Sequence, residues 1–380
     1  MANKRVNRPS KKLDSAAGVA ECESWFSDYS PQKFRQRILQ WFDRHKRDLP
    51  WRLNRDPYSI WVSEIMLQQT QVATVFDYFI RFMARFPTVA SLAAADEQSV
   101  LKFWEGLGYY RRARQLHQAA KIIVGEFGGR FPSEFDEVLR LPGIGRYTAG
   151  AITSIAYDQP SPILEGNTIR LFARLMGLAD DIRKPATQKA LWTFSTRIVS
   201  GKRAGDFNQA LMEVGSQVCR VKQPDCLRCP VASFCLALAT GRQNELPKST
   251  PKLEYESIRE AAIVVVRRRS ALLRICQHEE RWAGLWDFPR YPQPKLNSLM
   301  RLGKTFEQDY GLKLRLRDSG ISFRHAVTKY RIELNCLVGQ IEGGRARRSD
   351  RFRWVPINEL GGLPLSATGR KIANRINEFS

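Results

Sequence analysis

Apolar residues in the first two thirds of the chain recur at the spacing of helices. Phe34, Ile38, Trp41 and Phe42 form one such set, and apolar residues from 61 to 79 form a second. Asp56 can cap this second helix, and Pro57 suits its first turn. Further helical stretches are predicted at 98–104, 110–127, 134–140, 146–157, 167–177, 185–200 and 206–217. The pattern therefore predicts an all-α part that begins near residue 33.

The pattern changes to alternation of apolar and polar residues in the last third of the chain. Strands are predicted in AAIVVV, ALLRICQ, LKLRLR, YRIELNCLVGQ and RFRWVPI, and a closing helix at 366–379. The polar segment TGRQNELPKSTPKLEYES contains two prolines and is typical of a linker. We therefore expect a multidomain chain, with its parts divided as follows: a polar tail over 1–30, an all-α core over 31–237, a linker over 238–257 and an α+β domain over 258–380.

The charge of the chain narrows the class of partner. Lys and Arg total 61 against 38 Asp and Glu, a formal net charge of +23, which indicates a polyanion such as nucleic acid. A basic soluble protein without such a partner is the alternative. No run of 18 apolar residues is present, so we expect no membrane span. The basic start lacks an apolar secretory segment, so we expect a cytoplasmic protein used at a bacterial nucleoid, although its acid-free first 13 residues also fit an organellar transit peptide.

Four of the seven cysteines lie in one short segment, CRVKQPDCLRCPVASFC. Without a secretory signal, Cys219, Cys226, Cys229 and Cys235 are interpreted as metal ligands rather than disulfide partners. Their spacing, C-x6-C-x2-C-x5-C, favours a bulky iron–sulfur cluster over zinc, which usually binds two close pairs set well apart. Zinc remains the alternative, and four free thiols are a third.

Three other segments carry candidate chemistry. In LRLPGIGRYTAGAI, Gly143 and Gly145 allow a sharp turn before a helix N-terminus that can bind phosphate, although such turns are also simple connectors. Glu64 stands among apolar residues in WVSEIMLQQTQ, where burial raises the pKa of a carboxylic acid toward neutrality; a solvated surface glutamate is the alternative. Glu165, in PILEGNTIR, is either a helix cap or the second carboxylate of a pair that cleaves a glycosidic bond.

These segments together resemble a known family. The chain is similar to the A/G-specific adenine DNA glycosylases of the endonuclease III-like helix-hairpin-helix superfamily, closely over 33–237 and more loosely over 258–380. The likeness rests on LPWR, WVSEIMLQQTQVATV, GLGYYRRARQLH, LPGIGRYTAGAI, GNTIR, FNQALMEVG and the cysteine spacing. It implies a six-helix barrel beside a domain whose four cysteines hold a 4Fe–4S cluster, followed by a Nudix-like domain that senses 8-oxoguanine, matched best by RWAGLWDFP.

The resemblance also implies a reaction and its residues. It implies a monomer that removes adenine mispaired with 8-oxoguanine or guanine in double-stranded DNA. The implied roles are: Glu64 as general acid, Glu165 as the carboxylate that stabilises the sugar cation, Tyr147 and Asn167 as their supports, Trp51, Arg52 and Gln209 as the adenine pocket, Gln69 and Tyr109 as wedges in the base stack, and Gly143 and Gly145 as the phosphate-binding hairpin. Tyr147 stands where relatives that also cleave the strand have lysine, which implies base removal alone.

Two departures from the family pattern qualify these expectations. Glu165 replaces the usual aspartate, and Val327-Thr328-Lys329 replaces the usual Phe-Ser-His contact to 8-oxoguanine, so that only the hydroxyl of Thr328 is kept. The diphosphatase signature of Nudix hydrolases is absent, so DNA recognition rather than nucleotide hydrolysis is expected of this domain. The competing hypotheses are an endonuclease III-like lyase and a mismatch-binding protein with lost catalysis.

Overall fold

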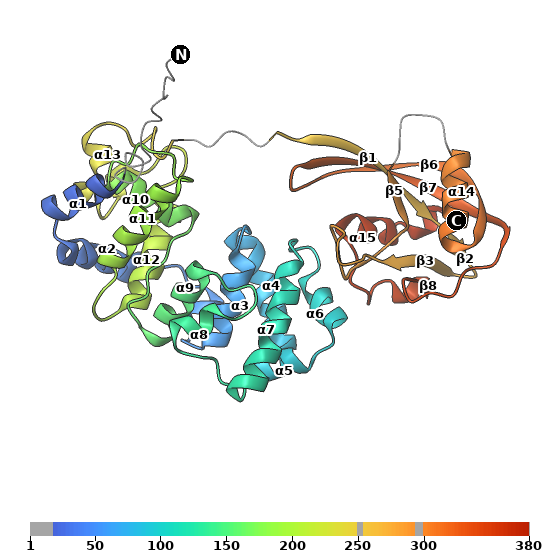
Figure 1. Ribbon diagram of the computed structural model, residues 1–380, viewed down its shortest axis with the longest axis horizontal. Helices are drawn as coiled ribbons and strands as arrows, with labels where there is room; N and C mark the ends of the chain where they lie inside the picture. The colour runs from blue at the N-terminus through green and yellow to red at the C-terminus, as the bar shows by residue number, and fades with distance from the viewer. Residues whose placement is uncertain (1–17, 249–253, 293–298, 380) are drawn as a thin grey trace, which may run out of the picture. The chain divides into compact units, whose positions relative to one another are not determined.

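The computed structural model describes residues 18–248, 254–292 and 299–379 (Figure 1). The chain divides into two compact units: a helical unit, Met1–Met83 with Ile122–Pro251, and a mixed unit, Ala84–Lys121 with Lys252–Ser380. Each unit is described by itself below. The predicted limits of the two sequence domains stay a prediction. No helix among the described residues is long and apolar enough to cross a membrane.

The helical unit is built around a core of aromatic side chains. Its elements are α1 Val19–Asp28, α2 Pro31–His45, the 3-10 turn η2 Pro50–Arg52, α3 Pro57–Leu67, α4 Val72–Arg85, the end of α7 Arg111–Phe127, α8 Phe135–Leu139, α9 Arg146–Tyr157, α10 Gly166–Leu175, α11 Pro185–Ile198, α12 Ala204–Gln217, η3 Cys226–Arg228, η4 Ala232–Phe234 and α13 Leu236–Ala239. The fully buried rings of Trp25, Phe34, Phe172 and Phe194 lie at its centre. Burial of these large rings stabilises this unit.

The predicted tail over 1–30 is wrong for its last part. Residues 19–28 form α1, and the indole of Trp25 is fully buried, with Nε1 donating to the carbonyl of Phe234 at 2.9 Å. A helix this short is stabilised by tertiary packing rather than by its own sequence. The polar residues around it therefore gave no sign of a helix. Residues 1–17 lie outside the described part of the chain.

The single helix predicted over 61–79 is in fact two helices. Its start is confirmed: Asp56 accepts hydrogen bonds from the backbone of Tyr58 and Ser59 at the N-terminus of α3. The helix ends at Leu67, however, and α4 begins at Val72. Gln69 between them has a φ of 57°, a left-handed conformation that a helix does not accommodate. The apolar spacing continued across this break and so did not reveal it.

Two glycines allow α9, α10 and α12 to approach one another closely. A Cβ at Gly215 of α12 would lie 2.8 Å from Cβ of Asn167, at the start of α10. A Cβ at Gly205 of α12 would lie 2.5 Å from the carbonyl oxygen of Ser154 in α9. Real Cβ atoms do not come so near, so these positions require glycine. The contacts fix the helix ends that carry the site described below.

The mixed unit contains two four-stranded sheets with helices. Its elements are α5 Val89–Ala94, α6 Glu97–Trp104, the first part of α7, β1 Glu256–Val264, β2 Val266–Arg267, β3 Ser270–Ile275, β4 Trp286–Asp287, β5 Arg290–Pro292, α14 Leu299–Tyr310, β6 Leu312–Val327, β7 Tyr330–Gly344, β8 Phe352–Pro356, η5 Ile357–Glu359, α15 Ala367–Asn374 and η6 Ile376–Phe379. One sheet has the order β5-β1-β7-β6, with β1 parallel to β7; in the other, β3 pairs with β2, β4 and β8. The predicted strands and closing helix are confirmed (Figure 1).

Contacts within the mixed unit join its helices to its sheets. Glu105 accepts from Arg370 at 2.6 and 3.0 Å, and Gln98 binds both Nε1 of Trp286 and the carbonyl of Gly284 at 2.9 Å.

In the helical unit, the expected linker is packed in its first half: Leu246 is 2% exposed, and its carbonyl accepts from Nε of Arg174 at 2.8 Å. Residues 249–253, in the middle of that linker, lie outside the described part.

Candidate active site

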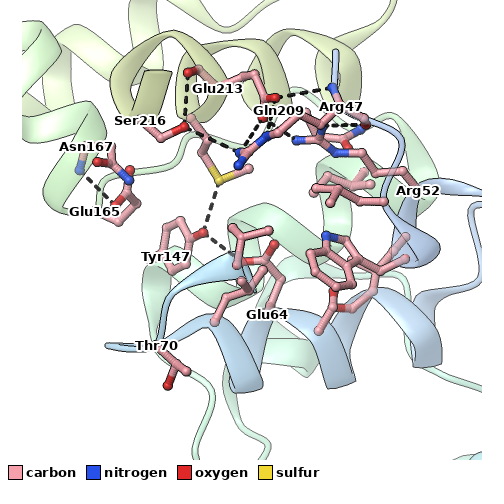
Figure 2. A pocket seen from close by; sticks show the side chains of 18 residues that line it. Arg47, Arg52, Glu64, Thr70, Tyr147, Glu165, Asn167, Gln209, Glu213 and Ser216 are labelled. Carbon is pink, nitrogen blue, oxygen red and sulfur yellow. Dashed lines mark hydrogen bonds and ion pairs between the residues drawn. The ribbon is translucent and has the colours of Figure 1, made fainter. Parts of the chain in front are cut away.

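Seven of the residues singled out in the sequence line one cavity of about 160 Å³ in the helical unit. They come from η2, α3, α9, α12 and the N-terminus of α10: Trp51, Arg52, Glu64, Tyr147, Glu165, Asn167 and Gln209. Figure 2 shows these elements around the pocket, with polar side chains pointing into it from several sides. The fold therefore gathers residues that are far apart in the chain into a single site.

Glu64 is a buried carboxyl group with the titration of a neutral-pH acid. It lies in α3, where residues 58–66 are all buried, and Glu64 itself is 5% exposed. Burial raises its pKa to about 7; the hydrogen bond from Tyr147 and the charge of Arg52 lower it, and the charge of Glu165 raises it. A carboxyl group with this pKa is protonated in part at neutral pH and can donate its proton. The expectation of a raised pKa is confirmed.

Tyr147 connects the glycine hairpin to this acid. It is the second residue of α9, and its hydroxyl donates to Oε2 of Glu64 at 2.7 Å (Figure 2). The hydroxyl oxygen of Tyr147 also lies 3.2 Å from the sulfur of Met212. Burial and the nearby carboxylates raise the pKa of Tyr147 well above its usual value, so the phenol stays a donor. This hydrogen bond fixes the orientation of the Glu64 carboxyl group.

Glu165 is a helix cap and also lines the pocket. Its carboxylate accepts from the backbone N–H of Asn167 at 2.8 Å and of Thr168 at 2.9 Å, which caps α10. Burial raises the pKa of Glu165, while these two amide hydrogen bonds and the charge of Arg170 lower it. The capping interpretation is therefore correct, and it is compatible with a second role because the same group borders the cavity. Two carboxyl groups of different environment thus share one site.

Gln209 and Trp51 present different chemistry to the cavity. The Gln209 side chain makes no hydrogen bond with any other described residue, so its amide keeps a donor and an acceptor available to a ligand. The indole of Trp51 is buried edge-on against Phe79, with ring centroids 5.4 Å apart, and forms an apolar wall. A planar molecule with donors and acceptors at its edge fits such a pocket.

Asn167 belongs to a polar network behind the pocket. Its Oδ1 accepts from Nη2 of Arg170 at 2.8 Å, and the same arginine donates to the carbonyls of Gly215 at 2.5 Å and Cys219 at 2.7 Å. Helix α10 therefore links the cavity to the start of the cysteine segment. Because Arg170 is buried and fully engaged, it holds Asn167 rigidly.

Sequence reasoning missed several residues of this site. Arg47, Met212, Glu213 and Ser216 also line the cavity. A signal for Glu213 was present, since it follows Gln209 by four residues within FNQALMEVG and so shares its helix face. Nothing in the sequence around Arg47 distinguishes it from the many other arginines of this basic chain.

The other predicted DNA-contact residues lie outside this cavity. Gln69 is exposed, and Gly143 and Gly145 form an exposed turn before α9. In the mixed unit, Tyr109 is 53% exposed, and Thr328 lies in the exposed turn between β6 and β7. Gln69, Tyr109 and Thr328 share a left-handed backbone, with φ of 57°, 48° and 51°. Such conformations are unfavourable for these residue types and concentrate at functional positions.

The four cysteines line a second, smaller cavity of the helical unit. Burial raises the pKa of Cys229 to about 12 and of Cys235 to about 11, and charges on neighbouring thiols contribute. Nη1 of Arg174 lies 3.2 Å from Sγ of Cys219. Among the described residues, no three His, Cys, Asp or Glu side chains are close enough to hold a single metal ion. Four thiols around one cavity fit the donor set of a larger cluster better than that of one ion.

Comparison with known proteins places both units in described families. A model of the HhH-GPD superfamily of base excision DNA repair proteins matches residues 62–196, and a NUDIX domain model matches 261–375. An adenine DNA glycosylase of Buchnera aphidicola (Baizongia pistaciae) is 31% identical over 354 residues, which cover 91% of this chain and 97% of the relative. A solved thermostable thymine-DNA glycosylase is 28% identical with a TM-score of 0.51, covering 55% of this chain and 97% of its own.

Longer relatives match this chain over part of their length. The adenine DNA glycosylase of Rattus norvegicus is 45% identical over 242 residues, which cover 60% of this chain and 47% of the relative. The chain thus spans about half the length of this mammalian protein. The Buchnera protein, by contrast, is matched over 97% of its length.

Proposed function

The chain belongs to the adenine DNA glycosylase family, and from that premise we propose that it removes adenine mispaired with 8-oxoguanine or guanine in double-stranded DNA. The observation that carries the proposal is the pairing, in one pocket, of a Glu64 acid whose pKa is about 7 with the separately capped Glu165. The net charge of +23 supports a DNA substrate. We infer that the chain acts as a monomer.

Adenine must leave the base stack before it can enter such a pocket. The free amide of Gln209 can pair with an adenine edge, where an amino donor lies beside a ring-nitrogen acceptor. Trp51 provides an apolar wall for the base. Arg52 completes the pocket and reaches it with part of its guanidinium exposed. These three residues would select adenine and hold it for the chemical step.

In the chemical step, protonated Glu64 donates its proton to a ring nitrogen of adenine. The N-glycosidic bond breaks with its electron pair leaving on the base, and the sugar becomes an oxocarbenium-like cation. The carboxylate of Glu165 stabilises this cation electrostatically. Water then adds to the sugar carbon and releases a proton, which gives an abasic site and free adenine. Tyr147 keeps the Glu64 carboxyl group oriented throughout.

A single-turnover assay on duplexes with A·8-oxoguanine and A·G pairs tests the function. Because Tyr147 replaces a lysine, the wild-type protein should release adenine and leave abasic sites that break only after hot alkali. Covalent trapping by borohydride would instead indicate an endonuclease III-like lyase. Tight binding without base release would indicate a mismatch-binding protein.

The mixed unit would recognise the partner base. Thr328 stands at the exposed β6–β7 turn, where its hydroxyl donates to the carbonyl of Val327 at 2.7 Å. A ring and an imidazole are absent from this turn, so we infer a weaker preference for 8-oxoguanine over guanine than relatives with those rings would have. The absence of the diphosphatase signature supports DNA recognition as the role of this NUDIX-family domain.

We propose that Cys219, Cys226, Cys229 and Cys235 hold a 4Fe–4S cluster. Bound there, the cluster would supply a structural cross-link for the segment that exposes Arg220, Lys222 and Arg228 to DNA phosphate. Protein purified without oxygen should contain iron and sulfide in about equal amounts, about four of each per chain, and absorb broadly in the visible range. Elemental analysis that finds one zinc and no iron would contradict this assignment.

A further inference from the structure

A buried carboxylate outside the proposed chemistry joins two walls of the pocket. Glu213 lies in α12, and 1% of its side chain is exposed. Its Oε1 accepts from Nε of Arg47 at 2.6 Å, and its Oε2 accepts from Nη2 of Arg47 and of Arg52, both at 2.9 Å (Figure 2). Gln217 also donates to Oε1. The oxygens are thus occupied, so Glu213 has no lone pair to spare for a base.

These contacts tie the loop after α2 to α12. The backbone N–H of Arg47 also donates to Glu213 at 3.3 Å, and Nη1 of Arg52 donates back to the carbonyl of Arg47 at 3.2 Å, which closes the network. This loop leads into Trp51 and Arg52, while Gln209 lies one helical turn before Glu213 in α12. One carboxylate therefore sets the spacing between the two sides of the base pocket.

The Glu213 carboxylate also balances the positive charge of Arg52 close to Glu64. The charged and titratable groups that line the pocket come from the loop after α2 and from five helical elements: Arg47 from the loop, Arg52 from η2, Glu64 from α3, Tyr147 from α9, Glu165 from the start of α10 and Glu213 from α12. The Arg52 charge lowers the pKa of Glu64. Burial opposes ionisation of Glu213, but hydrogen bonds from Arg47 and the charge of Arg52 outweigh burial and lower its pKa. Glu213 is therefore anionic at neutral pH and compensates Arg52.

We propose that Glu213 is a positioning residue for base excision, which holds Arg52 at the pocket wall and keeps the guanidinium charge from acting fully on the Glu64 acid. The inference rests on the proposed function, since it assigns Arg52 and Glu64 the roles given above. Removing one partner of a buried ion pair leaves an uncompensated charge. Without Glu213, Arg52 is free to turn its guanidinium toward the Glu64 carboxylate and to favour its ionised, inactive form.

The decisive variant is Glu213→Gln, which keeps the shape and one acceptor oxygen but removes the charge. Single-turnover rates are measured from about pH 5 to 9, because activity requires protonated Glu64 and is lost as pH rises through its pKa. The fall of the rate at high pH is the alkaline limb of the pH–rate profile. A lower pKa of Glu64 moves this alkaline limb to lower pH, and we expect a shift of about half a pH unit. Through this shift the rate should fall by about threefold at pH 8, and by less at pH 6.

Two further variants separate the electrostatic role from a structural one. Arg52→Gln in the Glu213→Gln background removes the uncompensated charge, so the alkaline limb should return toward its wild-type position although the rate stays low. Glu213→Asp keeps the charge but shortens the side chain, so it should slow the reaction and leave the limb in place. Asp43→Asn is the matched control, because it removes the partner of Arg203 from an exposed ion pair of α2, outside the pocket.

The outcomes distinguish this inference from the proposed function. A wild-type protein that releases no adenine contradicts the function itself. A wild-type protein that releases adenine, with a Glu213→Gln variant whose pH profile is unchanged, contradicts only the positioning role. If Glu213→Gln does not fold, Glu213→Asp decides the matter: a wild-type rate, or a displaced limb, in that variant overturns the inference.

Discussion

Replacing Glu64 by glutamine should reduce adenine release by about 10²–10⁴-fold while binding of the mismatched duplex persists. Glutamine keeps the volume of the side chain and an oxygen that can accept from Tyr147, but it has no proton to give the leaving base. Single-turnover release and duplex binding, measured on the same preparation, test this. Glu126→Gln, at an exposed site in α7, should leave both unchanged. Release at nearly the wild-type rate would place the acid elsewhere.

The same substitution should make the protein more stable. The pKa of Glu64 is raised from 4.5 to about 7 on folding, so between these values the folded state binds a proton that the unfolded state has lost. Stability therefore falls as pH rises through this window, and the full penalty remains above it. Glu64→Gln removes the penalty, and thermal or denaturant unfolding should show a gain of about 1–3 kcal/mol at pH 8 and a smaller one at pH 5. Equal gains at both pH values would disprove this account.

Glu165→Gln should lose most of the activity and also some stability. The neutral amide cannot stabilise a sugar cation, a contribution worth about 10²–10³-fold in comparable sites. It also weakens the cap of α10, since the carboxylate accepts from two backbone amides, and this should cost about 1 kcal/mol. Asp96→Ala, which removes the side-chain cap of α6 outside the pocket, should show the stability loss without the rate loss. An unchanged rate in Glu165→Gln would remove this residue from the mechanism.

Glu165→Asp separates the charge of this residue from its position. Aspartate also caps helices well, so stability should be kept. Its shorter side chain moves the carboxylate by roughly 1.5 Å if the backbone stays in place, and a misplacement of about 1 Å can cost about a hundredfold. We expect Glu165→Asp to be slower than the wild type, because the pocket is formed around glutamate. A gain of tenfold or more would mean instead that the natural residue impairs the enzyme.

The sequence revealed features that depend on neighbours in the chain. The apolar residues around Glu64 predicted its burial and its raised pKa, and Asp56-Pro57 predicted the start of α3. Features that depend on distant packing were not predictable in this way. Helix α1 exists because Trp25 docks against residues near Phe234, and the break at Gln69 leaves the apolar spacing intact. Glu64 and Glu165 were singled out from their surroundings in the sequence, whereas the other predicted cavity residues were found by family likeness.

The site residues that the sequence did not reveal also depend on distant packing. Glu213 binds Arg47, which precedes it by 166 positions, and no local pattern connects the two. The carboxylate cap at Glu165 was recognisable from its place before a helix, whereas its sharing of a cavity with Glu64 required the closed fold. Single residues with strong local consequences are therefore predictable from sequence, and pairs brought together by helix packing are not.

The glycines between α9, α10 and α12 mean that the candidate site can be disrupted by changes behind its wall. A methyl group at Gly215 would press on Asn167, and one at Gly205 would press on the backbone of α9, although neither glycine carries any chemistry. On the proposed function, loss-of-function alleles should therefore include changes at Gly205 and Gly215, which supply no acid, base or ligand group. The mutational target for such alleles is wider than the set of residues that line the cavity.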